Sequence, residues 1–389
     1  MASVLKLRDF TFDAPKNDKC DLLIIAGEHS GDEQASRMLK EALKKSPDLS
    51  VCAFGGLSLA EAGAQLIFDM TSFSVVGFAE VVKNYSFFKR LSVAIIDWII
   101  TYKPKAVCFV DYPGLNLHLA SELKKRGVSV AGGGEVKMLY YISPQIWAWK
   151  AKRRFKMAQL LDALAVIFPF EPDCYADTSL KVDFVGHPFL SSEYVPPVRY
   201  SPDGEILLLS GSREIAVSRI FPIMLDSLAL LKGERAVVVY PTEKIRTILE
   251  TALERRPALK DRVRIIHNGG EQIALKAAMM SSGTMSLSCS LEGIPGAIVY
   301  KANPLTYIIG RALVKIKYLS IANIILDKPA WREFIQFDAS AKSIATYMKE
   351  CLKPAARKEF EDYANTLKNL LSVDSEHTAA SWLIANVGK

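Results

Sequence analysis

Polar residues that could do chemistry follow an apolar run in the segment IIAGEHSGDEQAS (residues 24–36). The turn and the polar positions are Gly27, Glu28, His29, Ser30, Gly31 and Asp32. Ser30 or Asp32 could cap a helix that begins there, and free backbone N–H groups at such a start favour an anion or an acidic ligand group. Glu28 and His29 beside the start of this helix indicate a binding or catalytic site, although a plain strand-to-helix turn explains the glycines equally well.

Two further segments place a titratable residue directly after an apolar run. CFVDYPGLN (108–116) ends its run with Asp111. A carboxylate where a strand emerges can accept a proton from a hydroxyl, which is general-base chemistry, but an Asp that caps the next helix is an equal alternative. VGHPFL (185–190) places His187 after another run, either as a site residue or as a satisfied hinge residue.

Two turns in the second half of the chain favour a diphosphate. LLLSGSREIAVSRI (207–220) and SSGTMSLS (281–288) both join an apolar run to a helical pattern through a small-residue turn. The residues concerned are Gly211, Ser212, Arg213, Gly283 and Thr284. Backbone N–H groups and a guanidinium fork suit phosphate oxygens. D-x-D, H-E-x-x-H and paired Cys/His spacings are absent from the sequence, so we expect no metal and no cofactor.

The segment YYISPQIWAWKAKRR (140–154) combines large aromatic rings with positive charge. Trp147 and Trp149 are two positions apart, so at a strand end both rings would lie on one side. The cations that follow are Lys150, Lys152, Arg153 and Arg154. This mixture suits a packed core edge, a phosphate-bearing ligand or a membrane surface.

Two segments are candidates for contact with a lipid surface. NPLTYIIGRALVKIKYL (303–319) has apolar residues at helical spacing beside cations, and FSVVGFAEVVKNYSFFKRL (73–91) mixes aromatic and basic residues. The residues expected to contact lipid are Phe78, Lys83, Phe88, Arg311, Lys315 and Lys317. Each cation near anionic lipid contributes about 1 kcal/mol. The alternative is a core-facing helix with solvated cations.

These residues require a scaffold of alternating strands and helices. Apolar runs typical of buried parallel strands cover 21–27, 106–111, 137–143, 163–168 and 182–186, and later 206–212, 235–240, 262–267 and 296–300. The Pro- and Ser-rich residues between the two groups favour a linker. We therefore predict an α/β protein with two Rossmann-like, doubly wound domains facing a cleft: 1–190, a linker at 191–204, and 205–389. The last helical segments (about 339–387) close the second domain or cross back to the first.

Composition restricts the class of protein. Half of the 389 residues are hydrophobic and 23% are charged, which is typical of a globular chain. The net charge of +7 is a mild excess and does not indicate nucleic acid. The six cysteines form no C-x-x-C pair, so we expect reduced thiols. The first 20 residues lack the apolar region and small-residue cleavage site of a signal peptide, so we do not expect secretion. No uninterrupted apolar stretch reaches about 18–20 residues, so any membrane contact is expected to be peripheral.

Eight motifs in order carry a family resemblance: AGEHSGD, DYPGLN, YYISPQIWAWKAKR, FPFE, VGHP, GSR, SSGT and KYLSIANIIL. The chain resembles the lipid-A-disaccharide synthases, inverting glycosyltransferases with two Rossmann-like halves (the GT-B fold). The resemblance implies transfer of 2,3-diacylglucosamine from its UDP conjugate to the 6-hydroxyl of 2,3-diacylglucosamine 1-phosphate (lipid X), which releases UDP. It also implies a cytoplasmic protein at the inner face of the inner membrane. Alternatives are a UDP-sugar epimerase, a transferase for another acyl sugar, and a weakened membrane-bound binding protein.

The resemblance also assigns roles to residues. It implies Asp111 as general base with Glu28 and His29 beside it. It implies donor contacts from Gly211, Ser212, Arg213, Gly283, Thr284, Asn323 and Glu333. It implies an acceptor side formed by Ser30, Asn116, Ser143, Trp147 and His187. The chain departs from the family pattern at Ser210, Ala216 and Ser288, where the family has Pro, Glu and Glu, and in the insertion 131–136. The nearest acid to Ser288 is Glu292. The lost carboxylate is expected to affect donor affinity or donor identity, and the insertion is expected to affect the acceptor side.

Overall fold

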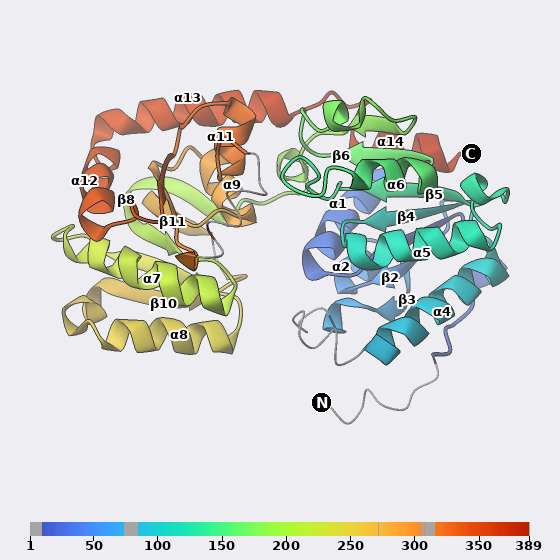
Figure 1. Cartoon of the computed structure of the whole chain (residues 1–389), viewed down its shortest axis with the longest axis horizontal. Coiled ribbons are helices and arrows are strands. Elements are labelled where there is room, and N and C mark those ends of the chain that lie inside the picture. The colour runs from blue at the N-terminus through green and yellow to red at the C-terminus, as the bar shows by residue number, and fades with distance from the viewer. Residues whose placement is uncertain (1–9, 74–84, 271, 305–306, 308–315, 389) are drawn as a thin grey trace. The chain divides into compact units, whose positions relative to one another are not determined.

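Two parallel β-sheets organise the chain (Figure 1), and the prediction of an α/β protein with two doubly wound domains is confirmed. The computed structural model describes residues 10–73, 85–270, 272–304, 307 and 316–388. Contacts divide the chain into a first unit, Met1–Tyr194 with Leu371–Lys389, and a second unit, Val195–Leu370.

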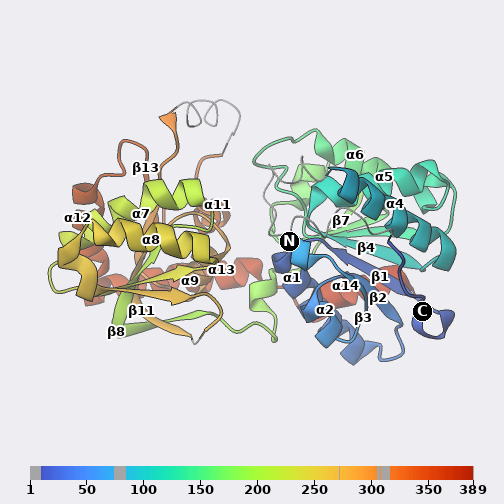
Figure 2. The same ribbon diagram turned by 90° about the horizontal axis from the view of Figure 1, so that it is seen from below.

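The first unit contains a seven-stranded sheet with the order β3-β2-β1-β4-β5-β6-β7. The strands are β1 (Leu22–Ala26), β2 (Val51–Gly55), β3 (Gln65–Asp69), β4 (Ala106–Val110), β5 (Lys137–Tyr141), β6 (Ala163–Val166) and β7 (Lys181–Phe184). Helices α1 (His29–Lys45), α2 (Leu57–Glu61) and α14 (Ala379–Val387) cover one face, and α4 (Tyr85–Tyr102), α5 (Pro113–Lys125) and α6 (Arg153–Leu160) cover the other (Figure 2). Every residue of β1, β2 and β4 is buried, because helices cover both faces of the sheet.

The second unit contains a six-stranded sheet with the order β10-β9-β8-β11-β12-β13. The strands are β8 (Val198–Leu209), β9 (Ala236–Tyr240), β10 (Val263–His267), β11 (Ile273–Met280), β12 (Gly296–Tyr300) and β13 (Arg332–Ile335). Its helices are α7 (Glu214–Ala229), α8 (Glu243–Glu254), α9 (Thr284–Leu291), α11 (Ile321–Leu326), α12 (Ala341–Cys351) and α13 (Pro354–Leu371). Helices α7 and α8 pack against each other and against β8 and β9, and α9 packs against β8 and α11.

Each sheet has one point at which the direction of winding reverses. In the first sheet this topological switch point lies between β1 and β4, and in the second it lies between β8 and β11. Ligands of open parallel sheets bind at the carboxyl ends of the strands beside such a point. The turns that follow these four strands are the AGEHSGD, DYPGLN, SGSR and SSGT segments.

Four strands were missed by the sequence analysis, namely β2, β3, β11 and β13. The sequence of β11, IALKAAMM, is rich in residues that favour helices, and burial between two neighbouring strands overrides that preference. The expected linker at 191–204 also differs from the structure, because β8 begins at Val198 and the boundary of the two units follows Tyr194.

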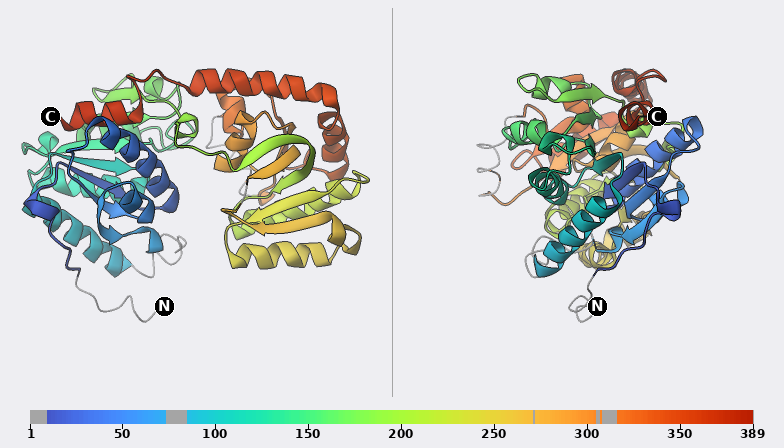
Figure 3. Two further views of the ribbon diagram at one scale, coloured as in Figure 1. Left: turned by 180° about the vertical axis from the view of Figure 1, so that it is seen from behind. Right: turned by 90° about the vertical axis from the view of Figure 1, so that its right-hand side faces the viewer.

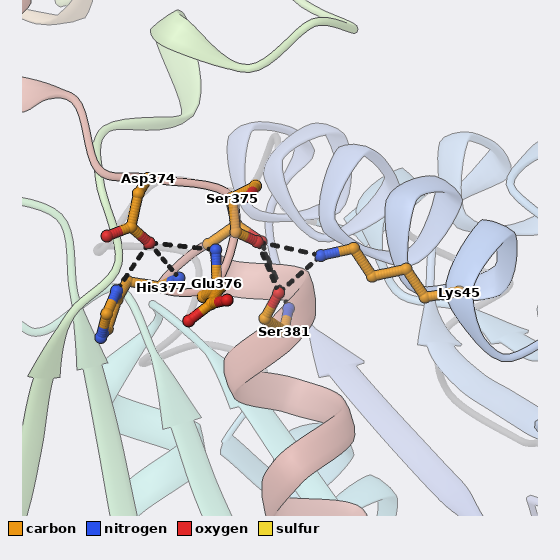
Figure 4. A network of polar contacts seen from close by, with 7 residues as sticks. Lys45, Asp374, Ser375, Glu376, His377 and Ser381 are labelled. Carbon is orange, nitrogen blue, oxygen red and sulfur yellow. Dashed lines mark hydrogen bonds and ion pairs between the residues drawn. The ribbon is translucent and has the colours of Figure 1, made fainter.

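The chain returns to the first unit at Leu371, the last residue of α13. Helix α14 then packs beside α1 (Figure 3). The Nζ of Lys45 on α1 donates to the carbonyl oxygen of Ser375 at 3.1 Å and to Oγ of Ser381 at 2.6 Å (Figure 4). These bonds attach the returning segment to the end of α1.

Candidate active site

The turn after β4 holds Asp111 in an unusual backbone conformation. Asp111 and Tyr112 have φ angles of 44° and 45°, in the left-handed region that side chains other than glycine rarely adopt. The Asn116 Nδ2 donates to the carbonyl oxygens of Val110 at 3.2 Å and Asp111 at 2.7 Å. Asn116 was expected on the acceptor side, but the structure buries it completely, where it braces this turn.

The environment of Asp111 suits a general base. Burial, together with the nearby Glu28 carboxylate, raises the pKa of Asp111 from 3.8 to about 6, and the backbone N–H of Tyr112 opposes the rise. An acid–base catalyst is most effective when its pKa lies near the working pH. Glu28 follows β1 and Asp111 follows β4, so the switch point of the first sheet brings these two predicted residues together.

The turn after β1 is shaped by contact rather than by a positive φ. Gly27 lies under the ring of Tyr112, a residue that the sequence analysis did not select. Helix α1 begins at His29, and the side chain of its N-cap, Glu28, makes no capping hydrogen bond. His29 and Ser30 are exposed at this start.

Asp32 has a different role from the one predicted. It lies inside α1 and is buried, so it does not cap that helix. Its carboxylate oxygens accept hydrogen bonds from the backbone N–H groups of Gly56 at 2.7 Å and Ser58 at 3.0 Å. Gly56 is the N-cap of α2, so Asp32 caps α2 and joins it to α1.

The prediction that Trp147 and Trp149 lie on one side of a strand end is wrong. Strand β5 ends at Tyr141, and both tryptophans lie in a turn segment where the two-residue periodicity of a strand does not apply. The half-buried Trp147 ring packs edge-on against Phe170, with 5.5 Å between ring centroids. Trp149 is 50% exposed, and Nζ of Lys150 lies 4.4 Å from its ring centroid. The pair therefore separates into a packing residue and a surface residue.

Ser143 and His187, both expected on the acceptor side, are buried. The Ser143 hydroxyl lies 2.7 Å from the hydroxyl of Tyr175. Nδ1 of His187 accepts a hydrogen bond from the backbone N–H of Phe189 at 3.1 Å, and its ring stacks on Phe168. Burial lowers the pKa of His187 to about 3, so the ring is neutral and packs as a structural residue.

The two predicted phosphate turns meet in the second unit. Gly211 after β8 has a φ of 102°, a conformation that requires glycine, and a Cβ there would lie 3.3 Å from Oγ of Ser281 after β11. Ser212 is exposed, and the exposed Arg213 is the N-cap of α7. The switch point thus places a guanidinium and the free N–H groups of a helix start at one edge of the sheet.

The start of α9 differs in detail from the prediction. The backbone N–H of Gly283 donates to Oγ of Ser286 at 3.1 Å and is therefore occupied. Helix α9 begins at the exposed Thr284, and the backbone N–H of Ser286 donates to the carbonyl oxygen of Gly283 at 3.2 Å. The N–H groups of Thr284 and Met285 at this helix start make no bond of the helical ladder. Oγ of Ser282 donates to the carbonyl oxygen of Leu319 at 2.8 Å, which ties this turn to the segment before α11.

Asn323 and Glu333, both expected at the donor, brace that segment through hydrogen bonds. The Glu333 carboxylate accepts hydrogen bonds from the backbone N–H groups of Leu319 and Ser320, at 2.9 Å to the nearer oxygen in each case. Nδ2 of Asn323 donates to Glu333 at 2.9 Å and to the carbonyl oxygen of Trp331 at 2.7 Å. Asn323 is fully buried, so it acts on a donor only through the loop that it holds.

Comparison with known proteins decides the family. The family model described as lipid-A-disaccharide synthetase matches residues 22–384. The chain belongs to this family. It is 34% identical over 349 residues to lipid-A-disaccharide synthase 1 of Legionella pneumophila (strain Philadelphia 1), covering 84% of this chain and 86% of the relative. It is 31% identical over 377 residues to the synthase of Nitrosococcus oceani, covering 93% of this chain and 95% of the relative. The lipid-A-disaccharide synthetase family member described here is therefore a hexosyltransferase of lipid A biosynthesis.

Solved structures share the fold of this lipid-A-disaccharide synthetase family member. The calicheamicin glycosyltransferase CalG4 matches with a TM-score of 0.54 at 12% identity, covering 95% of this chain and 98% of that chain. UDP-GlcNAc 2-epimerase from Neisseria meningitidis, bound to UDP-GlcNAc, matches with a TM-score of 0.56 at 12% identity, covering 94% and 98%. The GT-B fold thus occurs in both transferases and epimerases. The fold alone therefore does not distinguish the two activities, whereas family membership does.

Glu292 does not replace the family glutamate missing at Ser288. Ser288 is buried in α9, whereas Glu292 is the C-cap residue at the opposite end of that helix from Gly283. The carboxylate of Glu292 lies 3.9 Å from Nζ of Lys368 on α13. The start of α9 therefore gains no carboxylate from Glu292.

The predicted lipid contacts are only partly described. Phe78, Lys83, Arg311 and Lys315 lie outside the described residues. Phe88 on α4 is half-buried and packs against the core of the first unit, and Nζ of Lys317 pairs with Asp327 at 2.9 Å. None of the helices in the described part of the chain has both the length and the apolar character needed to cross a membrane.

Proposed function

We propose that this glycosyltransferase transfers 2,3-diacylglucosamine from UDP to the 6-hydroxyl of 2,3-diacylglucosamine 1-phosphate. The products are the tetraacyl disaccharide 1-phosphate and UDP. Family membership supports this substrate pair, and the arrangement of Asp111 supports the chemistry. We assign the acceptor to the first unit and the UDP-sugar to the second, because each unit carries the appropriate groups at its switch point.

Asp111 is the proposed general base. Its carboxylate accepts the proton of the 6-hydroxyl while that oxygen attacks the anomeric carbon from the face opposite UDP, so the configuration inverts. The anomeric C–O bond breaks and its electron pair leaves with the diphosphate. With a pKa of about 6, the Asp111 side chain is largely ionised at neutral pH.

The leaving diphosphate is held by the turns of the second unit. Arg213 offers a guanidinium fork, and the first turns of α7 and α9 offer backbone N–H groups. Fixed donors of this kind stabilise charge as it develops in the transition state. Because both substrates carry acyl chains, we further propose that the enzyme meets them peripherally at the inner face of the inner membrane.

A product assay tests the reaction. Purified protein receives UDP-2,3-diacylglucosamine and 2,3-diacylglucosamine 1-phosphate, and mass spectrometry follows the disaccharide 1-phosphate while a coupled assay follows UDP. Asp111→Asn removes the base but keeps the shape of the side chain, so we expect kcat to fall by about 100-fold or more with UDP affinity retained. Wild-type kcat in this variant would exclude Asp111 as the base, and an epimerised sugar without disaccharide would exclude transfer.

A further inference from the structure

Tyr140 is a buried tyrosine in the strand next to Asp111. It lies on β5, pairs in register with Phe109 of β4, and has no exposed surface. Its hydroxyl donates to the backbone carbonyl oxygen of Asp111. A phenol is costly to bury unless its hydroxyl finds a partner, so a tyrosine in place of phenylalanine indicates a use for this bond.

The carbonyl oxygen of Asp111 accepts two hydrogen bonds. Besides the Tyr140 hydroxyl, it receives Nδ2 of Asn116 at 2.7 Å. A carbonyl has two lone pairs, so the two side chains saturate it. The bonds act where two successive residues, Asp111 and Tyr112, adopt the left-handed conformation. Such a turn persists only when its surroundings hold it.

The donor itself remains protonated. Burial raises the pKa of Tyr140 well above its ordinary value, and the Asp111 carboxylate and Tyr175 raise it further. The charge of Arg153 and the Asn116 side chain oppose this rise. Tyr140 is therefore a hydrogen-bond donor across the pH range in which Asp111 titrates, and it does not exchange protons with substrate.

We propose that Tyr140 is a positioning residue for glycosyl transfer: its hydroxyl holds the Asp111 carbonyl so that the strained turn keeps the carboxylate at the β1–β4 switch point. This inference rests on the proposed role of Asp111 as general base. Asn116 supplies the second bond to the same oxygen, so loss of one donor weakens the turn without removing all support.

The test is a double-mutant cycle of Tyr140→Phe with Asp111→Asn. Tyr140→Phe removes one oxygen atom and keeps the ring, so we expect kcat to fall about 3- to 10-fold with both KM values unchanged. In the Asp111→Asn background the same change is expected to have no effect, because residues that act as a unit are non-additive. An equal loss in both backgrounds, or no loss in the Asp111 enzyme, would overturn the proposal.

The pH profile gives a second readout. The acid limb of kcat/KM is expected near pH 6 in the parent enzyme, since burial raises the pKa of Asp111 to about 6. In Tyr140→Phe a looser turn exposes the Asp111 carboxylate to water, which lowers its pKa. The acid limb of kcat/KM is therefore expected to move to lower pH. An unmoved limb contradicts the proposed positioning. Tyr141→Phe is the matched control, because its ring lies on the opposite side of the same strand, and it is expected to leave both readouts unchanged.

The cycle also separates two kinds of failure. If Asp111→Asn keeps full activity, the proposed general base is wrong and Tyr140 has nothing to position. If Asp111→Asn is inactive while Tyr140→Phe keeps the parent kcat and acid limb, only the inference about Tyr140 is wrong. Circular dichroism and thermal unfolding of each variant establish that the proteins compared are folded, and Asn116→Ala tests the same carbonyl through its other donor.

Discussion

A Cβ added to Gly27 would lie 2.4 Å from Cδ1 and 2.9 Å from Cε1 of Tyr112. The ring that follows Asp111 therefore rests directly on the backbone of the turn that carries Glu28. Neither distance leaves room for a methyl group. The close approach of the two turns, rather than a left-handed φ, requires glycine at position 27.

Gly27→Ala is expected to lower kcat by at least about 10-fold and to destabilise the protein by about 1–3 kcal/mol, because the Tyr112 ring must move. Gly114→Ala is the control. Gly114 lies in the first turn of α5 with no heavy atom within 4 Å of an added Cβ, so alanine there is expected to be neutral or slightly stabilising. Steady-state kinetics and thermal unfolding of both variants provide the measurement. A fully active Gly27→Ala enzyme would show that the contact is dispensable.

Asp111→Asn should stabilise the protein in a pH-dependent manner. The folded pKa of about 6 exceeds the ordinary 3.8, so the folded state binds the proton more tightly than the unfolded state. Ionised Asp111 therefore lowers the free energy of unfolding above pH 6, by about 1–3 kcal/mol, and this penalty disappears below pH 3.8. We expect a raised Tm at pH 8 and no difference near pH 3.5. A constant difference at both pH values would contradict the linkage.

Arg213 should determine the affinity for UDP. Arg213→Ala removes the guanidinium at the N-cap of α7. A charge-assisted hydrogen bond contributes about 1.5–3 kcal/mol, so we expect calorimetry to show that UDP binds about 10- to 100-fold more weakly. Arg213→Lys keeps the charge but loses the forked guanidinium, so the affinity of this variant for UDP should lie between those of the parent protein and Arg213→Ala. Equal affinity in all three proteins would place the diphosphate elsewhere.

Glu333→Gln tests whether Glu333 braces its loop. The amide keeps one acceptor oxygen for the N–H of Ser320 but places an NH2 donor where Oε2 accepts from the N–H of Leu319. The Tm should therefore fall, with a loss of about 1–3 kcal/mol. UDP affinity should fall by less than in Arg213→Ala, because Glu333 acts through the loop. A variant with the parent Tm and abolished UDP binding would instead assign Glu333 directly to the donor.

His187→Asn should reduce sensitivity to acid. The folded pKa of about 3 lies below the ordinary 6.5, so the unfolded chain binds the proton first. Stability from the neutral ring is complete above pH 6.5 and declines as the pH falls toward 3, by up to about 1.4 kcal/mol per pH unit. Asparagine keeps an acceptor for the N–H of Phe189 but does not titrate. The Tm of the variant should be lower at pH 7 and should fall less between pH 6.5 and 4.5; parallel curves would contradict this account.

Much of this protein follows from sequence alone. The alternation of apolar runs and helical patterns predicted two doubly wound α/β domains, because strands buried on both faces leave a clear apolar signature. The motif order predicted the family. Asp111 and Glu28 were selected because titratable residues after apolar runs stand at strand ends. The hydrogen bond from Tyr140 to Asp111 has a weaker signal in the sequence. That signal is a tyrosine inside an apolar run, because a buried tyrosine hydroxyl needs a hydrogen-bond partner.

Tertiary structure decided which strand ends meet. Strand order is set by packing between segments far apart in the chain, so only the sheets reveal that Glu28 meets Asp111 and that Gly211 meets Ser281. The tertiary structure also decided that the side chains of Asn116, Asn323 and Glu333 form hydrogen bonds with other groups of the protein. A polar side chain has the same type whether it faces a ligand or a backbone N–H group, and only its neighbours in space distinguish the two.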